Sequence, residues 1–134
     1  MAGFEQVSEA DQAARRRVAE KAREALRMAG LPAFQFGKNE SAVGAEIEID
    51  VGNDEAGGVF VAWRPDGQLS RLAAESVRNG QLSHPSIRQA GMISKTMRDA
   101  IIAILNSAGF AAEKSEDDMR PLSLRVVSGP SRAD

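Results

Sequence analysis

The polar and apolar positions along the chain follow two periods, which together predict a sheet and three helices. Alternation is clearest over residues 43–51, where small or aliphatic side chains at odd positions alternate with Gly44 and three acidic residues. A period of two indicates a β-strand that buries one face and presents the other to water. Residues 59–63 (VFVAW) are apolar on both faces, which favours a more interior strand.

An amphipathic helix is predicted over residues 9–29. Ser8 followed by Asp11 is a capping-box pattern, and Gly30-Leu31-Pro32 supplies a glycine, an apolar residue and a proline that together end a helix. The apolar stripe between these ends is mostly alanine. Alanine contributes little burial energy but lets another backbone come close, so this helix is expected to lie against a second surface.

Two further helices are predicted in the second half of the chain. A short one covers about 69–77, and a longer one has Ser83 or His84 as its N-cap, Pro85 in its first turn and a stop at Gly109. The longer helix is expected to be the central core helix. Its predicted stripe comprises Ala90, Ile93, Met97, Ala100, Ile101, Ile104 and Ala108, with Leu105 beside it.

The remaining strands are short and are expected at residues 33–36, 110–113 and 122–127. The resulting order is α-β-β-β-α-α-β-β. Strands grouped between helices favour a single α+β domain over 1–134, with a mainly antiparallel sheet and helices packed on one face. Residues 1–7 and 128–134 are expected to be flexible tails.

This order is roughly similar to that of bacterial secretion chaperones, which are small acidic homodimers. The likeness concerns the order of elements alone and implies a chaperone-like or adaptor-like role. Those proteins usually end in a further helix, which this sequence does not predict, and no sequence motif links the two.

The composition restricts the chemistry open to the chain. The 134 residues include no cysteine, which excludes a disulfide framework, a thiolate metal site and a cysteine nucleophile. No apolar run is long enough to cross a bilayer and the N-terminus has no secretory pattern, so we expect a cytoplasmic location and no membrane partner. Arginine outnumbers lysine and alanine is abundant, which we interpret as a GC-rich bacterial genome.

Charge is distributed in blocks although the formal net charge is only −2. Residues 15–27 hold six basic and two acidic side chains, residues 38–55 one basic and six acidic, and residues 64–98 six basic and two acidic. Such alternation favours contacts between oppositely charged faces, within one molecule or across a dimer, over a nucleic-acid track. A homodimer is also expected from the alanine-faced first helix and from sheet edges that need covering.

Glu46, Glu48 and Asp50 project from one face of the alternating strand, at intervals of about 6.8 Å. This spacing suits acid/base carboxylates or a hard-metal site. The simpler interpretation, which we favour, is that they are the solvated positions of an amphipathic strand. In an intermediate interpretation this acidic face receives a basic partner.

Six further positions are candidates for chemistry or binding. His84 is the only histidine and the one possible histidine base, although capping a helix is its expected role. Trp63 with Arg64 is expected at the margin of the core or, alternatively, as an anchor for a partner. The run Arg15-Arg16-Arg17 could contact a polyanion, but acidic residues interrupt this basic segment, and a solvated helix is favoured.

We therefore expect a non-enzymatic interaction or regulatory module that is homodimeric, binds protein, and uses no catalytic residue, metal or cofactor. Neither a phosphate-binding loop nor a serine nucleophile elbow occurs in the sequence. The alternatives are a small-ligand-binding domain and a carboxylate-dependent enzyme. Nucleic-acid binding through the basic first helix is less favoured.

Overall fold

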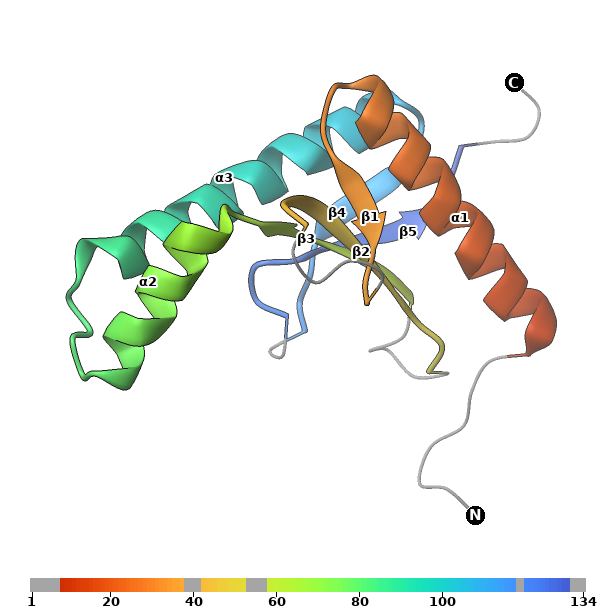
Figure 1. The fold of residues 1–134 in the computed structure, drawn as a ribbon. Helices are drawn as coiled ribbons and strands as arrows, with labels where there is room; N and C mark the ends of the chain where they lie inside the picture. The colour runs from red at the N-terminus through yellow and green to blue at the C-terminus, as the bar shows by residue number, and fades with distance from the viewer. Residues whose placement is uncertain (1–7, 38–41, 53–57, 118–119, 131–134) are drawn as a thin grey trace, which may run out of the picture.

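The computed structural model describes residues 8–37, 42–52, 58–117 and 120–130. Its elements are α1 (Glu9–Met28), β1 (Ala33–Gln35), β2 (Gly44–Asp50), β3 (Gly58–Arg64), α2 (Gly67–Arg78), α3 (Pro85–Ser107), β4 (Ala111–Lys114) and β5 (Leu124–Ser128). This is the predicted order (Figure 1). The tail predicted at 1–7, and the part of the other tail at 131–134, lie outside the described residues.

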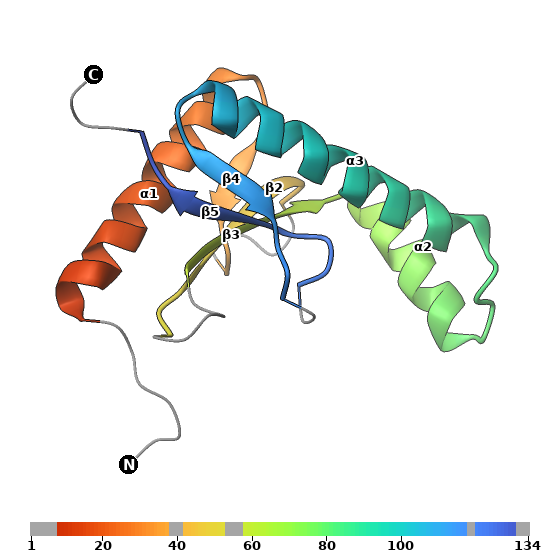
Figure 2. The same cartoon turned by 180° about the vertical axis from the view of Figure 1, so that it is seen from behind.

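The five strands form one sheet in the order β1-β2-β3-β5-β4. The pair β1–β2 is parallel and the other three pairs are antiparallel. Helices α1 and α3 lie on the same face of this sheet (Figures 1 and 2). The α+β class and the mainly antiparallel sheet are therefore confirmed. Strand β3 takes the central position that its two apolar faces predicted.

Helix α1 begins and ends as its sequence indicates. The Ser8 hydroxyl accepts a hydrogen bond from the Asp11 amide (3.2 Å), and the Leu31 amide donates to the Leu26 carbonyl (3.0 Å) past Gly30, whose φ is +92°. Its stripe, with Ala19 and Ala22 buried, packs on β1, β2 and β3. The small side chains thus serve close contact with the chain's own sheet.

The core lies between the sheet and the two helices that cover it. The sheet supplies Ile47, Val59, Val61, Leu124 and Val126, and the helices supply Leu26, Ile101 and Leu105. Trp63, opposite Ala45 in the β2–β3 ladder, packs partly buried at the margin of this core, as predicted.

Only the C-terminal half of α3 belongs to the core, which corrects the predicted stripe. Ile101 and Leu105 are fully buried, whereas Ile93 and Met97 are only partly buried. Leu105 thus lies at the centre of the buried face. The reason is that the first half of α3 extends beyond the sheet and packs against α2 (Figure 1). We refer to residues 67–98, which form this extension, as the α2–α3 hairpin.

Side chains from α1 and α3 bond to the main chain of two strands of the sheet. The side-chain oxygen of Asn106 accepts a hydrogen bond from the Ala112 amide (2.8 Å) in edge strand β4. The side-chain amide of Asn106 donates to the Ala112 carbonyl (3.1 Å). Arg15 of α1 donates to the carbonyls of Asp50 and Gly52 at the end of β2. The alanine stripe that suggested a homodimer is therefore engaged within one chain, and Asn106 binds one residue of edge strand β4. The homodimer stays a prediction.

Candidate functional site

Acidic residues predicted as site candidates lie on the sheet face opposite α1 and α3. Glu46, Glu48 and Asp50 project from β2 beside Phe60 of β3, which pairs with Glu48 in the ladder. In the described residues no helix covers this face (Figure 2). Phe60 is nevertheless buried, because charged side chains close over it.

We refer to the side chains of Glu48, Asp50, Asp117 and Arg120 as the charged cover, and Arg120 is at its centre. Its Nε lies 3.1 Å from Glu48 Oε1, its Nη2 2.9 Å from Asp50 Oδ2, and its Nη1 2.6 Å from Asp117 Oδ2. The guanidinium carbon lies 4.2 Å from the centre of the Phe60 ring, within cation–π distance. Burial lowers the pKa of Arg120, but the hydrogen bonds that it donates to Glu48, Asp50 and Asp117 more than offset this effect, so the pKa is raised.

A second arginine neutralises the remaining acid of β2. Arg64 Nη1 lies 3.4 Å from Glu46 Oε2, and its guanidinium carbon is 5.9 Å from the centre of the Phe34 ring. The side chains of Glu46, Glu48 and Asp50 are 20%, 37% and 28% exposed. The interpretation of these acids as solvated positions is therefore wrong in part: they are half-buried and ion-paired within the chain.

The three carboxylates of β2 are ion-paired with arginines of the same chain, which limits the reactions and ligands open to them. Oxygens of all three β2 carboxylates already accept from a guanidinium. Within the described ranges no three acidic or histidine side chains are grouped so as to hold a metal ion. We interpret the cluster as a structural cover for the open face of the sheet.

Sequence reasoning missed Arg120, Asp117 and Phe60. Asp117 and Arg120 lie in the segment between the strands predicted at 110–113 and 122–127, and Arg120 is the one arginine of that segment. The second signal was Phe60 itself, which β-strand alternation places on the same face as the acids. A large apolar side chain on a charged face requires a cover, and a long cationic side chain supplies one.

His84 lies at the outer end of the α2–α3 hairpin, away from the acids of β2. Its Nδ1 accepts a hydrogen bond from the Ser86 amide (3.1 Å) and lies 2.8 Å from the Ser86 hydroxyl. His84 is thus the N-cap of α3, as predicted, and the structure brings it into no group with the other site candidates.

Replacing His84 with alanine is expected to lower the free energy of unfolding by about 1 kcal/mol, because the first turn of α3 loses its side-chain cap. His84→Asn should retain most of the stability, since asparagine accepts the same hydrogen bond. Urea unfolding of both variants measures the difference. Equal losses would contradict the capping role.

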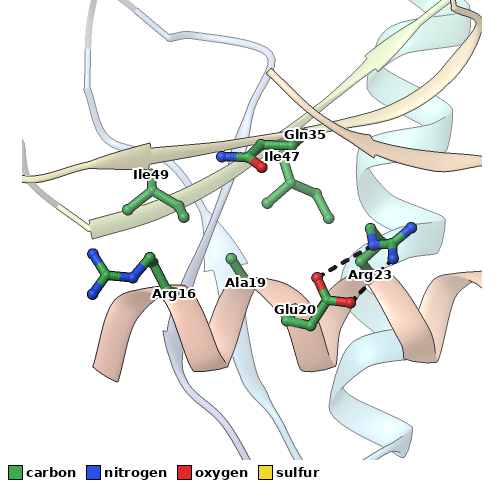
Figure 3. A pocket seen from close by; sticks show the side chains of 7 residues that line it. All are labelled: Arg16, Ala19, Glu20, Arg23, Gln35, Ile47 and Ile49. Atoms are coloured by element: carbon green, nitrogen blue, oxygen red, sulfur yellow. Dashed lines mark hydrogen bonds and ion pairs between the residues drawn. The ribbon is translucent and has the colours of Figure 1, made fainter. Parts of the chain in front are cut away.

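The three consecutive arginines of α1 have different environments. Arg15 bonds to backbone carbonyls near the end of β2, and Arg17 is exposed. Arg16 lines a crevice of about 240 Å³ between α1 and the sheet (Figure 3). We refer to this hollow as the α1–β2 crevice; it is lined by Arg16, Ala19, Glu20, Arg23, Gln35, Ile47 and Ile49.

Two other hollows are present in the described part of the chain. One, of about 560 Å³, adjoins the charged cover and is lined by Phe60, Glu113, Lys114, Ser115, Glu116, Asp117 and Arg125. The other, of about 520 Å³, lies on α3 of the hairpin and is lined by Pro85, Arg88, Gln89, Met92 and Ile93. The β2 acids and His84 line none of the three hollows.

Comparison with protein-family models, curated proteins and solved structures finds no match for this chain. The structure itself defines a two-layer α+β protein with a projecting helical hairpin. None of the helices it describes combines the length and the apolar character needed to cross a bilayer.

Proposed function

We propose that this protein is a non-enzymatic interaction module that binds an acidic, amphipathic segment of another protein through the α2–α3 hairpin. The observation that carries the proposal is the exposure of large apolar side chains on an element that projects beyond the sheet (Figure 1). A cytoplasmic location and a bacterial source, both expected from the sequence, belong to the same proposal.

The hairpin presents apolar surface because α2 packs on α3 alone. The buried residue of α2 is Ser76, whereas Leu72 and Val77 on the same helix are exposed. In the turn and on α3, Leu82 and Met92 are exposed as well, and Met92 with Ile93 lines the hollow on α3. Four exposed large apolar side chains on one projecting element favour a protein-binding role for that element.

The charge around these apolar residues indicates the partner. Exposed basic side chains on the hairpin are Arg71, Arg78, Arg88 and Lys95. Glu75 is the only exposed acid between residues 67 and 95. An apolar surface with a basic rim is complementary to a helix or extended segment that has apolar and acidic residues. Two hairpins of like charge would repel each other, so an acidic partner is favoured over a second copy.

The other classes weighed from the sequence have less support. A carboxylate-dependent enzyme would use the β2 acids, whose oxygens accept from Arg64 and Arg120. A polyanion track on α1 would use Arg15, which bonds to backbone carbonyls instead. A homodimer remains part of the proposal as a second arrangement, and sedimentation velocity at tens of micromolar protein measures it directly.

Substituting Met92 with glutamate should reduce capture of the partner by about tenfold, because it places a charge in the apolar surface. Met92 is 58% exposed, so the melting temperature should stay close to that of the wild type. The matched control is Met28→Glu, at a methionine that is 89% exposed at the end of α1. The measurement is quantitative mass spectrometry of proteins retained from native lysate by the immobilised wild type and both variants.

Support requires that the retained proteins carry acidic amphipathic segments, that Met28→Glu retains them, and that Met92→Glu does not. Retention that is equal for the two variants would refute the docking surface. Retention of nucleic acid in place of protein would favour the competing polyanion class.

A further inference from the structure

We propose that the α1–β2 crevice binds small organic acids with an apolar body, a property separate from protein binding at the hairpin. The ligand class is a linear or aryl carboxylate of about eight non-hydrogen atoms, since the crevice of about 240 Å³ has the volume of roughly eight liquid waters. A carboxylate and a small phosphate ester share the anionic chemistry, and the apolar wall favours the carboxylate with a hydrocarbon tail.

The crevice exists because β1 is short and α1 carries a small side chain above β2. Strand β1 ends at Gln35, so Ile49 in β2 has no neighbour from β1 in the ladder. Ala19 faces this position from α1 (Figure 3). Ile47 and Ala19 are almost fully buried at the bottom of the crevice, which provides an apolar surface for a hydrocarbon.

The charged residues at the mouth select an anion. Glu20 is held by Arg23, with Oε1 3.1 Å from Nη2 and Oε2 3.4 Å from Nε. Arg16 lies at the Ile49 end of the crevice (Figure 3), and among the described residues its guanidinium has no ion-pair or hydrogen-bond partner. The mouth therefore carries one excess positive charge, on Arg16 at its Ile49 end, and a guanidinium binds a carboxylate through charge-assisted hydrogen bonds.

The geometry favours a small molecule over an extended peptide. A peptide strand would add to the open edge of β2 beyond Gln35 and form main-chain hydrogen bonds there. The carbonyls of Asp50 and Gly52 near this end of β2 already accept hydrogen bonds from Arg15 of α1, which leaves fewer main-chain acceptors for an added strand. A compact ligand that enters between α1 and β2 does not need that edge.

The test is a titration of the ¹⁵N-labelled full chain with hexanoate, followed through amide chemical shifts. We expect saturable shifts centred on Ala19, Glu20, Ile47 and Ile49, with a dissociation constant in the millimolar range or tighter. Hexylamine, which has the same chain and the opposite charge, should produce no saturable shifts at these amides. The variant Arg16→Gln should weaken hexanoate binding by about fivefold, since the exposed guanidinium loses its charge-assisted hydrogen bond.

Arg17→Gln is the matched control, because Arg17 is the exposed neighbour that does not line the crevice. Its affinity for hexanoate should equal that of the wild type. A second variant, Ala19→Met, fills the crevice and should abolish binding, with the melting temperature confirming that it folds.

Three results would overturn the proposal: no saturable shift at the crevice amides, equal weakening by Arg16→Gln and Arg17→Gln, or shifts confined to the hairpin. Because the hairpin variant Met92→Glu leaves the crevice intact, it should bind hexanoate normally. The two proposals can therefore fail separately.

Discussion

Replacing Arg120 with methionine is expected to lower the free energy of unfolding by about 2–3 kcal/mol. Methionine keeps an apolar cover over Phe60 but removes the donor that holds Glu48, Asp50 and Asp117 together. A hydrogen bond to a charged group contributes about 1.5–3 kcal/mol, and the partial exposure of this cluster lets water replace some of that stabilisation. Urea unfolding followed by the fluorescence of Trp63, the only tryptophan, measures the change.

The control for this substitution is Arg23→Met, which breaks an ion pair between the more exposed side chains of Arg23 and Glu20. Its loss of stability should be clearly smaller than that of Arg120→Met. Adding Glu48→Gln and Asp50→Asn to Arg120→Met should restore part of the stability, because it removes uncompensated charge. Arg120 would lose its role as the centre of the cover if the two arginine variants were equally stable.

The second large effect is expected for Gly44→Ala, a loss of about 3 kcal/mol or more. Gly44 has a φ of +133°, and an added Cβ would lie 2.6 Å from the Pro32 carbonyl oxygen and 2.8 Å from the Pro32 Cβ. Backbone strain and overpacking each cost about 1–3 kcal/mol. The contact cannot relax easily, since that same carbonyl accepts the Ala45 amide at 2.9 Å, where β1 and β2 first meet. Urea unfolding measures this loss as well.

Gly91→Ala in α3 is the matched control and should have the opposite sign. An added Cβ at Gly91 meets nothing within 4 Å apart from its own helix, so the variant should gain about 0.5–1 kcal/mol from the better helix propensity of alanine. If both glycine variants shifted stability in the same direction, the close packing of Gly44 on Pro32 would be refuted.

The charge blocks of the sequence acquire specific partners in the structure. The acidic block around β2 is neutralised by Arg64, which begins the second basic block, and by Arg120, which lies outside every block. The complementarity expected from the sequence is therefore at least partly internal. Two surfaces remain basic without a neutralising acidic block, one on α1 and one on the α2–α3 hairpin. The hairpin adds four exposed large apolar side chains to this charge, and this is why the proposed partner is acidic and amphipathic.

Local interactions explain what could be predicted from the sequence alone. The ends of α1 follow from Ser8 and Gly30, and the start of α3 from His84, because a cap bonds to amides two or three residues away. Strand β2 follows from its alternation, and the central place of β3 from its two apolar faces. These features depend on neighbouring residues and were visible without coordinates.

The candidate sites depend instead on residues that are distant in the sequence. Arg120 meets Glu48 and Asp50 across separations of 72 and 70 residues, and no period or cap encodes such a contact. The crevice likewise depends on how far β1 extends beside β2. The exposure of the hairpin depends on how much of α3 the sheet can cover.

The sequence by itself thus determined the elements and their order, because caps and hydrophobic periods act over a few residues. Only the tertiary structure decided the strand order, the parallel β1–β2 pair, the engagement of the alanine stripe and the partners of the acids. Each of these features depends on which strands, helices and charged side chains pack together. Since many segments could make the same contact, the result depends on the whole chain.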